Sequence, residues 1–150
     1  MDAYAEMGQL KLLALDEQDL KIVSAHVQDA VMKVGELKYE AAARRFVLPM
    51  NRFAWEARTG FFRRQFERRK SVLDFGRVLS VKSAGIDREK PETVLSLLAI
   101  RFYRKEEPAG TIELAFSGGG SIALEVECIE ARLADLVGAW QASSRPIHQI

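Results

Sequence analysis

The strongest constraint on the fold is a glycine-rich loop, Ser117-Gly-Gly-Gly-Ser121, between two runs in which apolar and polar residues alternate. The apolar residues are Ile112, Leu114 and Phe116 before the loop and Ile122, Leu124 and Val126 after it. Successive side chains of a strand point to opposite faces, so each run has one apolar face. Two such runs joined by a short loop predict a β-hairpin. Because a strand and not a helix leaves the loop, its glycines do not predict a phosphate site.

Five other segments are predicted to be strands: residues 10–15, 30–39, 46–50, 72–83 and 94–104. Gly35 and Gly76 interrupt two of these segments and predict β-bulges, where a strand bends to close a sheet. Pro49 has no N–H donor, so we expect it at an edge or a distortion. The segment 94–104 is apolar on both faces at its start and is predicted to be central.

Two helices are expected. Asp16 is followed three residues later by Asp19, which resembles a capping box and predicts a helix from about Glu17 to Val27. A second helix is predicted from about Glu127, because apolar residues recur there at helical spacing. Its apolar stripe consists of Ile129, Leu133, Leu136, Val137 and Trp140.

About seven strands with an early and a late helix make the fold class α+β, mainly β. Consecutive hairpins that end in a helix fit a small antiparallel barrel or a strongly bent sheet, with the C-terminal amphipathic helix plugging its open end. The pleckstrin-homology barrel has this order of elements and is the expected topology. Residues 1–9 are predicted to be a flexible arm, residues 10–141 a single globular domain, and residues 142–150 a frayed tail.

The length and composition exclude several classes of protein. A chain of 150 residues is the usual size of one domain. The longest apolar run, Leu97-Leu-Ala-Ile100, is too short to cross a membrane, and the acidic N-terminus lacks the features of a signal peptide. Cys128 is the only cysteine, which excludes an internal disulfide and a cysteine-rich metal site. A cytoplasmic protein is therefore expected.

Positive charge is concentrated in residues 44–70. This segment holds nine basic and two acidic residues, a net charge of +7, whereas the whole chain carries +1 and the remainder therefore −6. Such a cationic band must be neutralised by internal carboxylates or by an anionic partner. The candidate binding residues are Arg52, Trp55, Arg58, Arg63, Arg64, Arg68, Arg69 and Lys70.

The basic segment has several interpretations. Phe62 and Phe66 are four residues apart, as are Arg64 and Arg68, which suggests a helical turn with an apolar and a basic side. Such a turn can bind nucleic acid through phosphates and stacked bases, or it can lie on anionic lipid. In the structural alternative, the phenylalanines anchor the segment to the core while the arginines stay solvated or pair with carboxylates.

Residues suited to catalysis or metal binding are sparse. His26 and Asp29 lack both the further ligands of a metal site and a nucleophile for a catalytic base, and the only other histidine is His148. Cys128 stands among glutamates, whose charge opposes formation of a thiolate. The sequence predicts no catalytic residue, no metal site and no cofactor, and it favours a protein that is not an enzyme.

Four blocks of sequence carry a resemblance to a known family. The blocks are Leu10-Lys-Leu-Leu-Ala-Leu-Asp-Glu-Gln-Asp-Leu20, Ser24-Ala-His-Val-Gln-Asp-Ala-Val31, Arg45-Phe-Val-Leu-Pro-Met-Asn-Arg-Phe-Ala-Trp55 and Leu124-Glu-Val-Glu-Cys-Ile-Glu-Ala-Arg-Leu133. Over roughly residues 10 to 140 the chain resembles a family of short alphaproteobacterial proteins described as a domain of unknown function. The family has no assigned activity, so the resemblance implies no site residue.

These observations favour a non-enzymatic binding or adaptor domain that contacts its partner through the region around residues 52–70. A protein or an anionic ligand is the expected partner, and nucleic acid is an alternative. A second hypothesis is a small-molecule-binding protein or an enzyme, in which arginines hold an anionic metabolite in a pocket at the barrel mouth. A third is a structural subunit that pairs through an edge strand such as residues 46–50.

Overall fold

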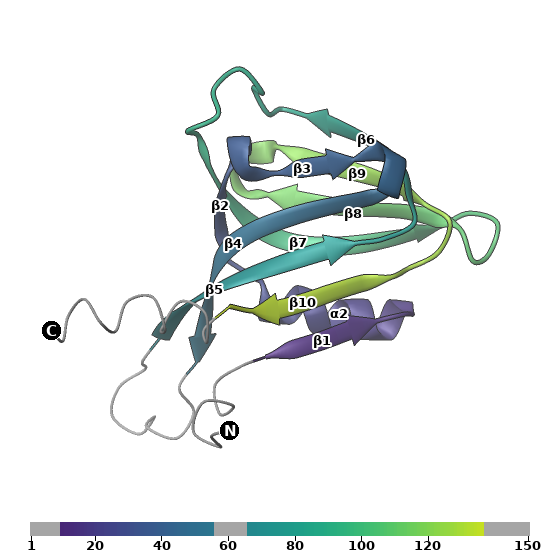
Figure 1. Cartoon of the computed structure of the whole chain (residues 1–150), viewed down its shortest axis with the longest axis horizontal. Coiled ribbons are helices and arrows are strands. Elements are labelled where there is room, and N and C mark those ends of the chain that lie inside the picture. Colours follow the sequence, from purple (N-terminus) through teal and green to yellow (C-terminus); the bar gives the residue numbers. More distant parts are fainter. Residues whose placement is uncertain (1–9, 56–65, 137–150) are drawn as a thin grey trace, which may run out of the picture.

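Ten antiparallel strands form one strongly bent sheet in the computed structural model of the chain, which describes residues 10–55 and 66–136 (Figure 1). The strands are β1 (Lys11–Ala14), β2 (Val31–Lys33), β3 (Lys38–Glu40), β4 (Arg45–Trp55), β5 (Phe66–Phe75), β6 (Val78–Ala84), β7 (Val94–Arg104), β8 (Gly110–Phe116), β9 (Ser121–Val126) and β10 (Ala131–Asp135). The helix α2 (Glu17–His26) follows β1, and short 3-10 turns cover Val34–Glu36, Ala41–Ala43 and Ser117–Gly119. Within the described residues, no helix has the length and apolar character needed to span a membrane.

The strand order is β1-β10-β5-β4-β2-β7-β8-β9-β6, with β3 paired to β4 beside this path. The sheet does not close into a barrel, but its two sides approach each other. The hydroxyl of Tyr39 in β3 donates a hydrogen bond to the carbonyl oxygen of Val78 in β6 at 3.2 Å. The amide of Val78 donates in turn to the carbonyl oxygen of Arg44 at 2.9 Å. The chain therefore adopts the bent-sheet form of the predicted α+β, mainly β architecture.

The predicted strands increase to ten because two segments divide and one strand was not foreseen. Residues 30–39 divide into β2 and β3 around a 3-10 turn, and residues 72–83 divide into β5 and β6 after Gly76. These glycines mark breaks and not bulges. A Cβ at Gly35 would lie 2.6 Å from the Cβ of Pro91, so the turn can pack here only without a side chain. At the second break Arg77 adopts a φ of 59°, which turns the backbone out of the strand.

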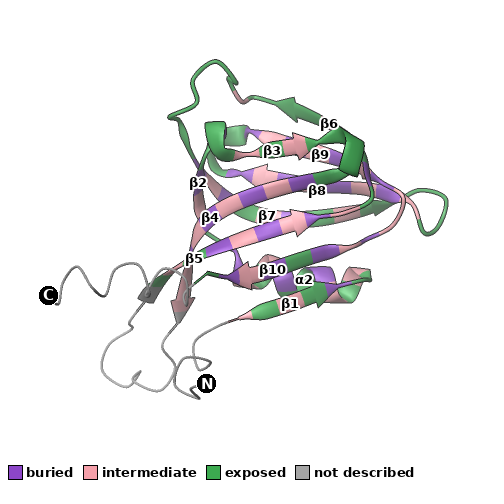
Figure 2. Ribbon diagram, viewed as in Figure 1, coloured by how far each residue is buried: buried purple, intermediate pink, exposed green. Residues whose placement is uncertain are grey.

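The hairpin around the glycine-rich loop is confirmed. Strands β8 and β9 pair in register, with Ile112 opposite Leu124 and Leu114 opposite Ile122. All six alternating apolar residues are buried, and none is more than 3% exposed. The prediction that residues 94–104 are central is also confirmed, because β7 lies between β2 and β8. Buried and more exposed residues alternate along these strands, so the core lies on the inner face of the bent sheet (Figure 2).

Strand β4 lies inside the sheet, so the hypothesis of edge pairing through residues 46–50 is wrong. Its neighbours are β5 on one side and β3 followed by β2 on the other. Pro49 sits at the distortion that its missing donor predicts. The ladder with β3 ends at Val47 and the ladder with β2 begins at Asn51, so Pro49 falls in the gap between them. No strand hydrogen bond is therefore lost at the proline.

Helix α2 confirms the predicted early helix. The carboxylate of its N-cap residue, Asp16, accepts a hydrogen bond from the amide of Asp19 at 2.8 Å. Leu20, Val23 and Val27 form the buried face of the helix, which packs against β1 and β7. The hydroxyl of Ser24 accepts a hydrogen bond from the amide of Ile100 at 3.0 Å and so ties the helix to β7.

We expect Asp16→Ala to lower the free energy of unfolding by about 1 kcal/mol, because it leaves an amide at the start of α2 without its acceptor. Chemical denaturation of the two proteins measures this difference. Asp87→Ala serves as the control, because this exposed loop aspartate also accepts from a backbone amide but caps no helix. Equal stability of the Asp16 variant and the natural protein would contradict the capping role.

The predicted C-terminal helix is wrong within the described residues, because Ala131–Asp135 form strand β10. Along this strand Leu133 and Asp135 are buried while Arg132 is exposed, which is the period of a strand. Strand β10 fills the space between β1 and β5 and pairs with both. The backbone hydrogen bonds that β10 makes with its two neighbours stabilise the strand more than the local apolar pattern favours a helix.

The expected pleckstrin-homology topology depended on that C-terminal helix. Because residues 131–135 form a strand, the main argument for this topology is lost. Helix α2 covers the inner side of the sheet beside β1 (Figure 1). Two residues of the predicted stripe, Val137 and Trp140, lie outside the described residues. The predicted arm (1–9) and tail (142–150) lie outside them as well.

Candidate functional site

The described part of the basic segment forms strand β4 and the first half of β5, which pair with each other. Strands β4 and β5 pair from Phe46 opposite Phe75 as far as Trp55 opposite Phe66. Their neighbours stop earlier, since β2 pairs with β4 at Asn51 and β10 pairs with β5 only up to Ser71. Residues 52–55 and 66–70 therefore continue past these ladders as two strands paired with each other, while the amide of Leu136 still donates to the carbonyl oxygen of Lys70 at 2.7 Å. We call this pair of segments the β4–β5 ribbon.

The two faces of the β4–β5 ribbon carry different basic residues. Arg52 and Arg69 stand opposite each other on the face that continues into the core. Phe53 and Arg68 stand opposite each other on the outer face, where Lys70 follows. The guanidinium carbon of Arg68 lies 5.6 Å from the centre of the Phe53 ring, a cation–π contact. The predicted helical turn is wrong for Phe66 and Arg68, which belong to β5, and its other two residues, Phe62 and Arg64, lie outside the described residues.

The structure places only part of the predicted binding set. Arg58, Arg63 and Arg64 lie outside the described residues, and Trp55 is described only as the last residue of β4. Arg68 and Lys70 are exposed, whereas Arg69 is half-buried. Arg52 does not belong to an accessible surface, because it is 5% exposed.

Arg52 forms a buried ion pair with Asp135 of β10. Its Nε and one terminal nitrogen donate to the two carboxylate oxygens at 2.9 and 2.8 Å. Asp135 also accepts from the hydroxyl of Ser71 at 2.6 Å and from the amide of Leu10 at 3.0 Å. Four donors thus converge on one carboxylate and tie β4, β5, β10 and the residue before β1 together. Burial raises the pKa of Asp135, but the hydrogen bonds from Arg52 and Ser71 outweigh it and leave the pKa below its usual value.

This lowered pKa predicts a loss of stability in acid. As the pH falls below about 4, the unfolded chain takes up a proton on Asp135 before the folded chain does. The stabilisation is thus present above this pH and is lost as the pH falls through the folded-state pKa. Urea unfolding of the natural protein and Asp135→Asn at neutral pH and at about pH 3 tests this. The stability difference should be smaller in acid, and a difference that grows in acid would contradict the assignment.

Two other arginines of the basic segment pair with carboxylates. Arg44 lies 2.8 Å from Glu127, and Arg45 pairs with Asp74. Together with the Arg52–Asp135 pair, these pairs agree with the structural interpretation of the basic segment, in which internal carboxylates neutralise its arginines. No ion pair joins Arg68 or Lys70 to a residue whose side chain the structure describes.

The outer side of β1, β10, β5 and β4 is strongly basic. Alternation along these strands puts five cations and one carboxylate on this side, which we call the basic face. The cations are Lys11, Arg45, Arg68, Lys70 and Arg132, and the carboxylate is Asp74. Lys11 and Arg132 lie far from the basic segment in sequence, so only the strand order reveals that they share its face.

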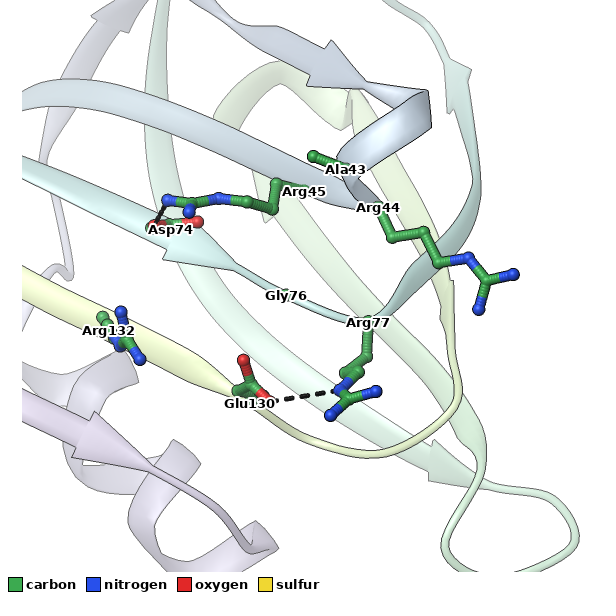
Figure 3. A pocket seen from close by; sticks show the side chains of 8 residues that line it. All are labelled: Ala43, Arg44, Arg45, Asp74, Gly76, Arg77, Glu130 and Arg132. Atoms are coloured by element: carbon green, nitrogen blue, oxygen red, sulfur yellow. Dashed lines mark hydrogen bonds and ion pairs between the residues drawn. The ribbon is translucent and has the colours of Figure 1, made fainter.

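A pocket lies at the end of the basic face opposite the β4–β5 ribbon (Figure 3). It has a volume of about 260 Å³ and is lined by residues of β4, β5 and β10 and of the connections that precede β4, follow β5 and precede β10. Its charged residues are Arg44, Arg45, Asp74, Arg77, Glu130 and Arg132. Figure 3 shows Arg45 reaching Asp74 and Arg77 reaching Glu130. The sequence did not predict this pocket, because Arg77 and Arg132 stand outside the basic segment.

The residues weighed for catalysis or metal binding are not among those that line the pocket or form the β4–β5 ribbon. Nδ1 of His26 is 2.9 Å from the carbonyl oxygen of Ile22 at the end of α2. Cys128 is half-buried in the connection between β9 and β10. In residues 10–55 and 66–136, histidine, cysteine and carboxylate side chains form no group of three that could hold a metal ion.

Comparison with known proteins bears on the family of this chain. No curated protein and no solved structure matches it. A family model described as "Protein of unknown function (DUF2948)" matches residues 10–148, which include all four blocks that carried the resemblance. The resemblance to a domain of unknown function is therefore confirmed, and the chain belongs to the DUF2948 family.

Proposed function

We propose that this protein is a non-enzymatic binding module that docks an acidic segment of a partner protein on its basic face, with Arg68 and Lys70 of the β4–β5 ribbon at the centre of the contact. The observation that carries the proposal is the imbalance of charge on this face, where the four strands carry five cations and one carboxylate, Asp74, which pairs with Arg45. Opposite charge on a partner speeds its association and selects it over neutral or basic proteins.

The chemistry of the outer face favours an acidic protein over nucleic acid. Proteins that bind single strands use exposed aromatic rings as stacking platforms for bases. On the described part of the β4–β5 ribbon, the ring of Phe53 is instead in contact with the guanidinium of Arg68. The chain as a whole carries a net charge of only +1, which is also far from the strongly basic balance of most nucleic-acid-binding domains.

We expect the double variant Arg68→Gln/Lys70→Gln to bind a fluorescent oligoglutamate peptide at least about tenfold more weakly than the natural protein, because two charge-assisted contacts are lost. Fluorescence anisotropy at low and high salt measures the affinity, and binding by the natural protein should weaken as salt rises. A single-stranded DNA oligonucleotide of equal charge serves as the competing ligand.

The control is Arg88→Gln/Lys90→Gln, which removes two exposed charges from the loop between β6 and β7. This variant should bind the peptide as the natural protein does. If both double variants lost affinity for the peptide equally, the loss would reflect the lower net charge of the protein. That result would contradict a binding surface centred on Arg68 and Lys70. Tighter binding of the oligonucleotide than of the peptide would contradict the choice of an acidic protein partner.

A further inference from the structure

The pocket at the far end of the basic face gathers four arginines from three parts of the chain. Arg44 precedes β4, Arg45 begins it, Arg77 lies between β5 and β6, and Arg132 lies in β10. Hydrogen bonds between backbone groups fix these parts relative to one another. The amide of Gly76 donates to the carbonyl oxygen of Glu130 at 2.8 Å, and the amide of Glu127 donates to that of Arg77 at 3.0 Å.

The carboxylates around the pocket neutralise three of the four arginines. Asp74 pairs with Arg45, and Glu130 lies 3.4 Å from Arg77. Glu127 lies 2.8 Å from Arg44 and 3.8 Å from Arg77. Arg132 is the exception. It stands opposite Asp74 on the neighbouring strand, but no ion pair joins it to any residue that the structure describes. The pocket therefore carries a net positive charge of one, and the guanidinium of Arg132 can bind an anion there.

Two of these arginines are held in a backbone conformation that favours glycine. Arg44 has a φ of 57° and Arg77 a φ of 59°, both in the left-handed region. A residue with a Cβ is strained there, and residues that retain such strain cluster at functional sites. In both places a long cationic side chain is kept where glycine would fit the backbone better, and both side chains line the same pocket.

The size of the pocket limits what it can hold. Its volume of about 260 Å³ is below that of pockets for drug-sized ligands, which begin at about 300 Å³. Gly76 contributes to this shape, because a Cβ there would lie 2.6 Å from a carboxylate oxygen of Glu130. A compact anion fits this space better than a nucleotide or a lipid headgroup with its chains.

We propose that this pocket binds the phosphate group of a small metabolite, with Arg132, Arg45 and Arg77 as its ligands. Guanidinium groups donate pairs of hydrogen bonds to phosphate oxygens, and a phosphate group offers more oxygens and more negative charge than a carboxylate to three arginines on different elements. The site goes beyond the docking of a partner protein. Arg45 and Arg52 are seven residues apart along β4, so about 20 Å separates the pocket from the β4–β5 ribbon.

Calorimetric titration with inorganic phosphate tests the proposal, with sodium chloride of equal ionic strength as the blank and succinate as the carboxylate probe. The natural protein should bind one phosphate, and its melting temperature should rise with phosphate concentration. Arg132→Gln should weaken the affinity about tenfold or more, since a charge-assisted contact is lost. Arg68→Gln/Lys70→Gln should bind phosphate as the natural protein does, which separates this site from the β4–β5 ribbon.

Arg77→Gly separates binding from folding. Glycine relieves the left-handed backbone but adds freedom to the unfolded chain, and because these effects oppose each other the melting temperature should change little. Phosphate affinity should nevertheless fall as it does in Arg132→Gln. The proposal is overturned if the natural protein binds no phosphate, if all variants bind it equally, or if succinate binds more tightly than phosphate.

Discussion

Asp135→Asn is expected to lower the free energy of unfolding by about 3–5 kcal/mol, because it leaves the guanidinium of Arg52 buried without its counter-charge. The Asp135 side chain is 0% exposed and that of Arg52 is 6% exposed, so water cannot replace the lost partner. The change preserves the size of the side chain and creates no cavity. Urea denaturation of the natural protein and the variant measures the difference.

Two comparisons show whether the loss comes from the buried charge. Asp74→Asn breaks the ion pair with Arg45 on the same sheet, but Arg45 is 45% exposed and the expected cost is about 1 kcal/mol or less. Arg52→Met combined with Asp135→Leu removes both charges and should recover much of the stability lost in Asp135→Asn. Similar costs for Asp135→Asn and Asp74→Asn would contradict the role given to the buried pair.

Leu133→Ala is expected to lower the free energy of unfolding by about 2–5 kcal/mol, because Leu133 is 1% exposed in the middle of β10. Leu136→Ala should change it by about 0.5 kcal/mol or less, because Leu136 is 41% exposed. A helix with the predicted apolar stripe would bury both leucines, so the pair of variants distinguishes strand from helix. Comparable losses in both variants would contradict the strand.

Local pattern predicted most of the elements that the described residues form. The hairpin of β8 and β9 and the helix α2 each carry their signal within about a dozen residues, through period-two alternation in one case and the cap at Asp16 in the other. Both elements are confirmed because their local preferences agree with their place in the fold.

The errors arose where distant strands decide the structure. Residues 131–135 have a helical pattern, but they lie between β1 and β5, whose backbone groups need partners. The break after Gly76 was also misjudged. The local sequence fits a bulge, whereas Arg77 turns the chain from β5 toward β6, whose neighbour is β9.

The candidate surfaces were only partly predictable for the same reason. Concentration of charge identified the basic segment, but it did not reveal that Arg44 and Arg52 each pair with a carboxylate 83 residues away. The addition of Arg132 to the same face follows from β10 pairing with β5, which the predicted helix excluded. Pairing across a sheet depends on strand order, and local patterns in one sequence do not reveal that order.

In the function proposed above, the exposed cations of the β4–β5 ribbon serve binding and not stability. The most direct test of this proposal compares melting temperature and oligoglutamate affinity in Arg68→Gln/Lys70→Gln and in Arg88→Gln/Lys90→Gln. Exposed charges contribute little to stability, so both variants should melt within a few degrees of the natural protein. Only the first should lose affinity, and this loss should shrink as salt rises. A ribbon variant that melts much lower, or that binds the peptide normally, would contradict the account.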